Sequence, residues 1–450
     1  MLRKPYIFAA LVALALAPAA SAQWNEEVLY SFQGIPDGIG PIGRIVHDKQ
    51  GNLYGATVDG GAANCQGTAQ CGTVYELTPP AKNGDPWAEV VLHVFQPIDT
   101  GDGAAPGGGL VMDGAGNLYG VTGYQGTGQC ELFGSVDGCG TVYEMSPPSQ
   151  PGGAWTEAVI YNFQGGKDGY VPNGDLVFDK AGNLYGVTLF GGGRGTTCDA
   201  FYGGNCGTWT EKVLYSFAGA GPWSVNGDGG QPIGGLVFDA KGNIYGTTFY
   251  GGDSAGICES RAGCGTAFEL LAPRRNSDRW TEKVLHRFQG QPNDGVGPNG
   301  NLILVDGALY GTTVGGGAPE NGTIFQLQLT PGGDGDWTEA IIHVFGGGEE
   351  GDGTSPLLSG PNLTFYGTAG GSNPGDGGAI YQLQPPGQEG GQWIYSEDYT
   401  FPPFGSQNAY DPQDLGFVNG GSGMYGSSLY GGSSQNCGDS GCGTVWGVRP

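Results

Sequence analysis

Long hydrophobic runs are almost absent from this 450-residue chain, and their absence excludes most membrane-spanning architectures. The one apolar run, YIFAALVALALA, follows Arg3 and Lys4 and precedes Ala20-Ser21-Ala22, a small-residue motif typical of signal-peptide cleavage. We therefore expect residues 1–22 to be a signal peptide that is cleaved after Ala22. Residues 23–450 would then be a secreted or cell-envelope protein without membrane insertion.

Basic residues are scarce as well. The chain has 17 Lys and Arg against 43 Asp and Glu, so its formal net charge is −26. Because such a surface repels phosphate groups, nucleic acid and anionic membranes are excluded as partners. An extracellular glycan or another protein remains a candidate partner, and we expect a monomer.

Glycine and aromatic residues are abundant instead. The chain contains 94 Gly, 22 Tyr, 19 Phe and 9 Trp, and no apolar run follows the 3.6-residue period of a helix. This composition is typical of short strands joined by many turns. The aromatic residues recur at regular places and can form a core, which argues against disorder.

An internal repeat organises the whole chain. The tripeptide Leu/Ile/Met/Phe-Tyr-Gly recurs seven times, with its tyrosine at Tyr54, Tyr119, Tyr185, Tyr245, Tyr310, Tyr366 and Tyr425. A tryptophan with a phenylalanine eight residues later also recurs seven times, starting at Trp24, Trp87, Trp155, Trp209, Trp280, Trp337 and Trp393. Each copy of such a repeat is one supersecondary unit.

Each unit predicts four strands, with the patterns PxGxLVFD, GNLYGxT, GTVYEL and WTExVLYxF. Seven such units predict an all-β fold, a seven-bladed β-propeller with four antiparallel strands per blade, formed by the single domain 23–450. A parallel β-helix is the alternative, but the coils of a β-helix are much shorter than the repeat units of this chain. The chain begins with a fourth strand and ends with a third, so we expect the N-terminal strand to complete the last blade.

Repeat three departs from this pattern, because CGT at 206–208 runs directly into WTEKVLYSF at 209–217. Thirteen residues that separate these motifs elsewhere are missing. We expect 207–217 to form one strand instead of two, which leaves blade three deficient and the weakest of the ring. Residues 218–230, with Trp223, would cover its outer edge as an irregular strand.

The motifs GNLYG-T, GG and CGTVYEL, with the Trp-led strand, resemble those of the GloVer tandem-repeat family of exported bacterial proteins. The resemblance covers essentially all of 23–450. It implies a secreted repeat protein with no known catalytic activity. Members commonly carry a C-terminal surface anchor, which we expect to be absent here because the chain stops at Pro450.

The ten cysteines fall into five local pairs, each expected in the loop between the second and third strands. An even, local pattern in an exported chain predicts disulfides, and no His accompanies any pair as a zinc site would require. The expected disulfides are Cys65–Cys71, Cys130–Cys139, Cys198–Cys206, Cys258–Cys264 and Cys437–Cys442.

Histidines and one set of aspartates are the other candidate functional residues. His93, His286 and His343 stand where other repeats have Tyr, which predicts packed rings and not general bases. The motif D-G-x-x-P precedes the innermost strand at Asp37, Asp102, Asp168, Asp228, Asp294 and Asp352. It fits a turn. Alternatively, these carboxylates form a ring at one mouth of the axial channel that could bind a polyol or cations such as Ca²⁺.

The sequence therefore predicts a non-enzymatic binding or interaction module at the cell envelope or outside the cell. The first alternative is a secreted carbohydrate-active enzyme, a glycoside hydrolase or lyase, that uses acidic residues at the propeller mouth. The second is a structural surface protein without a ligand. An enzyme would be expected to break the repeat symmetry with unique polar residues in one or two blades.

Overall fold

A computed structural model gives the structure of the chain. It describes residues 24–61, 71–82, 84–96, 101–132, 135–136, 138–150, 152–191, 199–203, 209–218, 227–252, 258, 263–274, 279–290, 294–318, 320–330, 332, 335–347, 355–370, 377–388, 390–403, 409–418, 423–434 and 436–449. The expected signal peptide lies outside these residues. Within them there is no helix long and apolar enough to cross a membrane.

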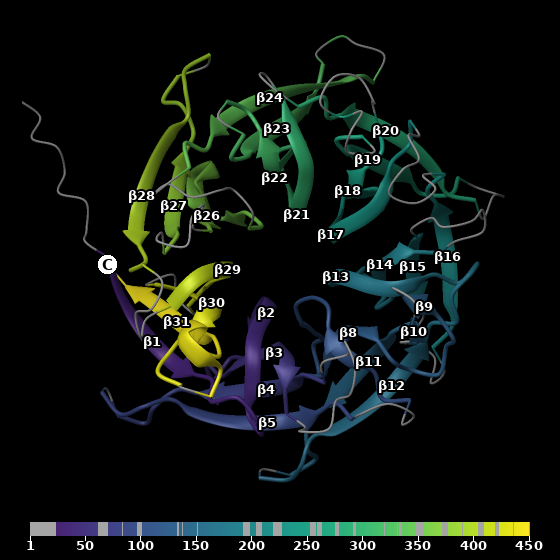
Figure 1. Cartoon of the computed structure of the whole chain (residues 1–450). Coiled ribbons are helices and arrows are strands. Elements are labelled where there is room, and N and C mark those ends of the chain that lie inside the picture. Colours follow the sequence, from purple (N-terminus) through teal and green to yellow (C-terminus); the bar gives the residue numbers. More distant parts are fainter. Residues whose placement is uncertain are drawn as a thin grey trace, which may run out of the picture.

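The described strands form sheets that succeed one another around a central axis, with the first strand of each sheet nearest the centre (Figure 1). From the centre outward, the four-stranded blades are β2 (Gly38–His47), β3 (Leu53–Gly60), β4 (Thr73–Thr78) and β5 (Ala88–Val94); β13 (Tyr170–Phe178), β14 (Leu184–Phe190), β15 (Asp199–Gly203) and β16 (Glu211–Ser216); β17 (Gly230–Phe238), β18 (Ile244–Tyr250), β19 (Thr266–Leu271) and β20 (Thr281–Arg287); β21 (Gly295–Val305), β22 (Ala308–Gly316), β23 (Thr323–Leu329) and β24 (Trp337–Val344); β25 (Leu358–Ser359), β26 (Phe365–Ala369), β27 (Ala379–Gln384) and β28 (Ile394–Thr400); and β29 (Ala409–Phe417), β30 (Met424–Gly431), β31 (Thr444–Arg449) and β1 (Asn25–Ser31). Short 3-10 segments occur at Pro361–Leu363 (η4) and Gly438–Ser440 (η5).

Repeat two forms a five-stranded sheet. Its strands are β6 (Ala104–Pro106), β7 (Val111–Met112), β8 (Leu118–Tyr124), β11 (Thr141–Ser146) and β12 (Thr156–Asn162), and a separate hairpin joins β9 (Glu131–Leu132) to β10 (Ser135–Val136). The innermost strand is broken into β6 and β7 around Gly107-Gly108-Gly109, since a run of glycines weakens a strand. The propeller class and the antiparallel pairing are confirmed. The expectation of seven blades with four strands each, the third of them deficient, holds only in part: among the described residues, six sheets have four strands.

The two ends of the chain share one sheet. β1 pairs with β31 in antiparallel register from Asn25 opposite Arg449 to Ser31 opposite Thr444. In Figure 1 the purple first strand accordingly lies along the yellow last one. The N-terminal strand thus completes the sheet that the C-terminal repeat begins, as the order of motifs predicts.

Repeat three has a regular four-stranded sheet, and its predicted deficiency is wrong. The missing third strand is β15, whose residues DAFYG pair with β14 on one side and β16 on the other. Tyr202 lies opposite Tyr185 just as Glu269 lies opposite Tyr245 in the next blade. Residues 211–216 are the fourth strand, so nothing further is needed at the edge. Most of the segment 218–230, with Trp223, lies outside the described residues.

Aromatic residues hold adjacent sheets together. The phenylalanines that close the Trp-led strands are buried. Contacts edge to face with a ring on the third strand of the next sheet are made by Phe32, Phe95, Phe217, Phe288, Phe345 and Phe401. For example, the centroid distances are 5.0 Å for Phe95–Tyr143 and 4.9 Å for Phe217–Phe268. Such pairs add roughly 0.5–1.5 kcal/mol each beyond the burial of their area.

Candidate functional site

A bulge in the innermost strands places one residue of each strand at the propeller axis. In β2 the register with β3 shifts between Ile42 and Val46, and β13, β17 and β21 shift at the same place. Bulges of this kind redirect a side chain and are common beside functional sites. The residue that follows the bulged glycine is Arg44 in β2, Asp175 in β13, Gly235 in β17 and Asn301 in β21.

Glycines at these bulges bring the innermost strands close together. Gly174 and Gly234 have φ of +80° and +78°, a region in which glycine alone is unstrained. A Cβ on Gly174 would collide with the carbonyl oxygen of Gly234, and one on Gly234 would collide with Gly300. The glycines therefore allow the close backbone approach that narrows the channel at this level.

Three side chains from three different sheets meet across the channel at this level. The Asp175 carboxylate accepts a hydrogen bond of 2.8 Å from the Gly109 backbone and one of 2.6 Å from the Asn301 amide. Arg44 Nε lies 3.8 Å from the same carboxylate. The Asn301 side-chain oxygen in turn accepts from the Gly235 backbone N–H. The two blades with glycine at the axial position thus supply backbone donors to the side chains of the others.

A second carboxylate, Asp414 of β29, joins this axial cluster. Its residue is only 7% exposed, and burial raises its pKa to about 7, with the negative charge of Asp175 adding to the effect. Arg44 and the Leu415 N–H, which donates a 2.7 Å hydrogen bond to Asp414, act in the opposite direction. Near neutral pH this group therefore exists in both protonation states.

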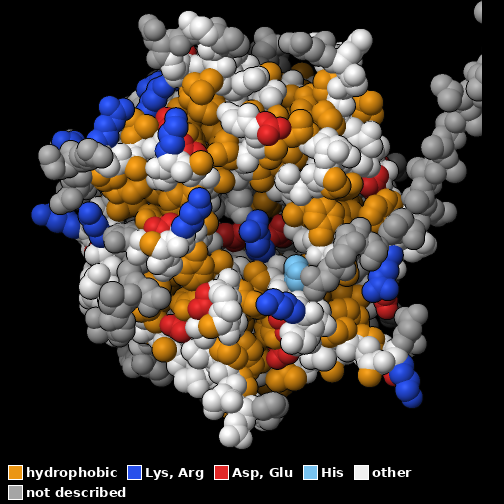
Figure 2. Space-filling model, turned by 180° about the vertical axis from the view of Figure 1, so that it is seen from behind, with side chains coloured by type: hydrophobic (Ala, Val, Ile, Leu, Met, Phe, Trp, Pro, Cys, Tyr) orange, Lys and Arg blue, Asp and Glu red, His pale blue; other side chains and the backbone are white. Residues whose placement is uncertain are grey.

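The axial cluster lines a small open cavity. Arg44, Asp175, Asn301 and Asp414 border a space of about 160 Å³ together with backbone of the bulges. The Arg44 side chain keeps 49% of its surface exposed although protein surrounds it, because the channel admits solvent. Figure 2 shows a basic side chain at the centre of the ring between recessed acidic ones.

The predicted aspartates lie elsewhere. None of the described ones lines the axial cavity, and each contacts the outermost strand of the preceding sheet. Each carboxylate accepts from a backbone N–H just beyond that strand and contacts its Tyr or His. These pairs are Asp37 with Gln33 and Tyr30, Asp102 with Gln96 and His93, Asp168 with Gln164 and Tyr161, Asp228 with Ala218 and Tyr215, and Asp294 with Gln289 and His286. Asp352 lies outside the described residues.

The described aspartates therefore stabilise the crossing between blades, and a ring of carboxylates around the channel mouth stays a prediction. Asp37, for instance, accepts a 2.7 Å hydrogen bond from the Gln33 N–H and one of 3.1 Å from the Tyr30 hydroxyl. This arrangement agrees with the turn interpretation of D-G-x-x-P. Ligand binding at these carboxylates stays a prediction.

A glutamate from the Trp-led strand of the next sheet faces each of these aspartates. Burial raises the pKa of each glutamate to about 7, and the neighbouring aspartate adds to the rise; one oxygen of each is buried and lacks a hydrogen-bond partner. The glutamates are Glu89, Glu157, Glu211, Glu282 and Glu339. We call a Tyr or His, its Asp and this Glu an inter-blade triad.

At the boundary between β28 and β29, the glutamate itself accepts the hydrogen bonds from the tyrosine hydroxyl and from a backbone N–H that the aspartate accepts elsewhere. Glu26 of β1 accepts hydrogen bonds from the Tyr399 hydroxyl at 2.9 Å and from the Ala409 N–H at 3.1 Å. The repeat has Asn408 in place of the usual aspartate at this boundary. The sequence signal for the triads is the Glu that stands two residues after the tryptophan. This Glu belongs to the pattern WTExVLYxF of the fourth strand.

Two inter-blade triads contain histidine. His93 Nε2 lies 3.2 Å from both oxygens of Asp102, and His286 Nε2 lies 3.2 Å from Asp294 Oδ2. Both rings meet a buried phenylalanine edge on, as Tyr161 does, so the prediction that histidine takes a tyrosine place in the packing is confirmed. His343 meets Phe345 edge on in the same way, and it also stacks on Tyr395 at 4.0 Å.

Three of the five predicted disulfides are described. The sulfurs of Cys130–Cys139, Cys258–Cys264 and Cys437–Cys442 are bonded, and each pair lies in the loop before a third strand. Cys71 is also disulfide-bonded, whereas Cys65 lies outside the described residues. The predicted pair Cys198–Cys206 lies outside them as well.

Solved structures show only a distant likeness to the chain. A protein from Lactobacillus plantarum has 14% identity over 80% of this chain and 84% of its own, with a TM-score of 0.48. The periplasmic gluconolactonase PpgL of Pseudomonas aeruginosa has 14% identity over 80% and 85%, with a TM-score of 0.47. PhoX of Pseudomonas fluorescens, solved with vanadate, has 11% identity over 95% of both chains, with a TM-score of 0.45.

Family membership follows from the repeat itself. No curated protein matches the sequence. The model of the Gloeobacter/Verrucomicrobia repeat matches three overlapping stretches, 15–198, 129–332 and 203–446, which together span almost the whole chain. The resemblance stated above is therefore confirmed, and the chain belongs to the Gloeobacter/Verrucomicrobia repeat family.

Proposed function

We propose that this chain is an exported, non-enzymatic binding module whose recognition site is the axial cluster of Arg44, Asp175, Asn301 and Asp414. The observation that carries the proposal is the loss of repeat symmetry at one place. At the axial position two blades have glycine, Gly109 and Gly235, and the blade of β25 contributes Pro356 to the cavity, whereas four blades supply charged or amide side chains that converge there. A scaffold without a ligand would need no such difference.

The ligand that fits best is one sugar ring at the end of a glycan. Arg44 offers guanidinium donors toward solvent, and Asp414 can donate or accept near neutral pH because its pKa is about 7. At a water volume of about 30 Å³, the cavity of about 160 Å³ holds roughly five waters, which is the size of a small polar ring. A neutral ligand also avoids repulsion from the net charge of −26.

Export of the protein is supported by its disulfides. Such bonds persist in oxidising compartments, and three are described in this chain. The region outside the cytoplasm, either the cell envelope or the medium, is therefore the proposed location.

A glycan array followed by calorimetric titration of the best monosaccharide tests the proposal. We expect Arg44→Gly and Asn301→Gly, which introduce the residue of other repeats, to weaken binding at least tenfold. Asp37→Asn is the matched control, since it alters an inter-blade triad and leaves the axis intact, and its affinity should equal that of the parent. If Asp37→Asn abolishes binding and Arg44→Gly does not, the site is at the triads and the proposal is wrong.

A carbohydrate-active enzyme is the second candidate, and the pKa of Asp414 favours it. A buried carboxyl group with a pKa of about 7 is suited to act as a general acid at neutral pH. Hydrolysis of polysaccharides or chromogenic glycosides that is lost in Asp414→Asn would establish the enzyme. We expect no turnover in either protein.

A further inference from the structure

We propose that the two histidine-containing inter-blade triads, His93–Asp102–Glu157 and His286–Asp294–Glu339, are Zn²⁺ sites. Among the described residues, these are the groups of three whose ligand atoms lie within 4.8 Å of one another. The three residues come from β5, from the loop that follows it and from β12 in the first site, and from β20, the following loop and β24 in the second. A bound metal would therefore join two neighbouring sheets.

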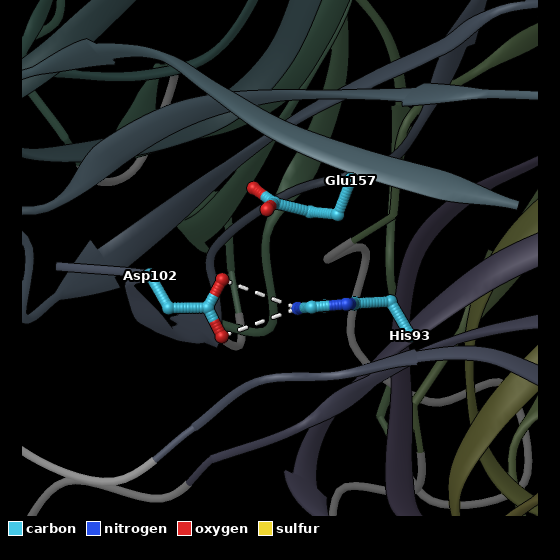
Figure 3. A group of neighbouring side chains, drawn as sticks. All are labelled: His93, Asp102 and Glu157. Carbon is cyan, nitrogen blue, oxygen red and sulfur yellow. Dashed lines mark hydrogen bonds and ion pairs between the residues drawn. The ribbon is translucent and has the colours of Figure 1, made fainter. Parts of the chain in front are cut away.

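The ligand geometry suits a tetrahedral ion. Two ligands at 2.0–2.1 Å from zinc on tetrahedral corners are about 3.3 Å apart. His93 Nε2 is 3.2 Å from both Asp102 oxygens, and Figure 3 shows this pair with the Glu157 carboxylate turned toward it. The backbone N–H of Gln96 holds Asp102 in place with a 2.8 Å hydrogen bond, which is the kind of outer contact that orients a metal ligand.

The charges of each triad match a divalent cation. A neutral imidazole and two carboxylates bring a charge of −2, which a Zn²⁺ ion cancels in a partly buried place. One oxygen of Glu157 and one of Glu339 are buried without a hydrogen-bond partner.

A further buried group faces the first site. The Tyr143 side chain is completely buried, its hydroxyl has no hydrogen-bond partner, and the charge of Glu157 contributes to raising its pKa. The phenol oxygen and the unpaired Glu157 oxygen are thus two buried polar atoms without a hydrogen-bond partner beside this site. In the second site Phe325 takes this position, so that site offers only its three ligands.

The same chain contains matched triads that lack a nitrogen ligand. Tyr161–Asp168–Glu211 and Tyr215–Asp228–Glu282 have the same aspartate and glutamate but a tyrosine hydroxyl in place of the imidazole. Burial and the neighbouring carboxylates raise the pKa of the Tyr161 phenol, so it stays protonated and is a poor ligand. Zinc should distinguish the two kinds of triad, because imidazole is one of its preferred ligands.

The test is a calorimetric titration of the full mature chain with ZnCl₂ after treatment with EDTA and dialysis. We expect two ions per chain. His93→Tyr and His286→Tyr restore the residue of other repeats and should keep the fold. Each should remove one ion, and together they should remove both.

Two further measurements make the result decisive. Tyr161→His should create a third site, and Co²⁺ should give visible absorption in the parent that is absent from the double His→Tyr variant. The absence of zinc binding at 10 µM, or the same binding in the double variant, would overturn the proposal. Equal binding of Ca²⁺ by parent and double variant would assign the sites to the carboxylates alone, and would overturn it too. Circular dichroism would establish that each variant is folded.

Discussion

The five half-buried glutamates of the inter-blade triads should make the folded protein less stable as the pH rises through neutrality. In the folded state burial raises their pKa values from 4.5 to about 7. The folded chain therefore holds more protons than the unfolded chain between these pH values. By linkage, the free energy of unfolding falls as the pH rises through this window. The stability that the protonated glutamates contribute is fully present only below about pH 4.5.

The size of the effect can be worked out per site. A shift from 4.5 to about 7 corresponds to roughly 3.4 kcal/mol at about 1.4 kcal/mol per pKa unit, but these side chains are partly exposed and solvent screens them, so we take about 1–1.5 kcal/mol each. For five sites the sum is roughly 5–8 kcal/mol, which is comparable to the whole stability of many domains.

The assay compares guanidinium unfolding midpoints at pH 5, 6, 7 and 8 in EDTA with the disulfides intact. We expect the variant with Glu→Gln at positions 89, 157, 211, 282 and 339 to be more stable than the parent at pH 8 and similar to it at pH 5. Its control carries the same change of charge at exposed residues, with Glu→Gln at 27, 131 and 320 and Asp→Asn at 85 and 306. The control separates loss of buried charge from relief of general repulsion.

Either of two results would refute this reasoning. The first is a parent protein whose unfolding midpoint does not fall between pH 5 and pH 8. The second is a control variant that flattens the pH dependence as much as the buried set does. The second result would mean that the net charge of −26, and not the triads, makes the folded protein sensitive to pH.

Three other predictions concern the scaffold. Mass spectrometry of non-reduced digests should find Cys65–Cys71 and Cys198–Cys206 beside the three described disulfides, and any crossed peptide would contradict the repeat alignment. Phe201→Pro removes a backbone N–H from the central strand β15 and should lower the free energy of unfolding by at least about 3 kcal/mol in guanidinium titrations; an unchanged midpoint would mean that β15 is not paired there. Gly174→Ala, at φ +80° against the backbone of Gly234, should cost at least about 2 kcal/mol more than Gly114→Ala, which has nothing within 4 Å; equal costs in the same titration would show that the axis has room for a methyl group.

The strands and their order could be predicted because their signals are local. Asp239, for example, accepts hydrogen bonds from the backbone N–H of Lys241 and Asn243, so the turn between β17 and β18 is encoded within five residues. The strand β15 could not be found in this way, because DAFYG lacks the Gly-Thr marker of the other third strands. Its equivalence appears only in the register with β14.

The axial cluster escaped prediction for a different reason. A repeat is recognised by what its copies share, whereas Arg44, Asp175 and Asn301 are the residues in which the copies differ. The D-G-x-x-P aspartates were placed correctly before the innermost strands, but their partners come from the sheet before. Contacts across a blade boundary, such as His93 with Asp102 and Glu157, depend on how two repeats pack and not on either repeat alone.

The pairing of β1 with β31 has a consequence for how the protein folds after export. The first strand to emerge finds its neighbour only when residues 444–449 have emerged, more than 400 residues later. Until then its edge is unpaired, and closing so long a loop carries a large entropic cost. Because the two ends finally lie side by side, a chain with joined ends and new termini in another loop between blades would face the same delay with a different first strand. The order of assembly is thus set by where the chain is cut, while the finished ring would be the same.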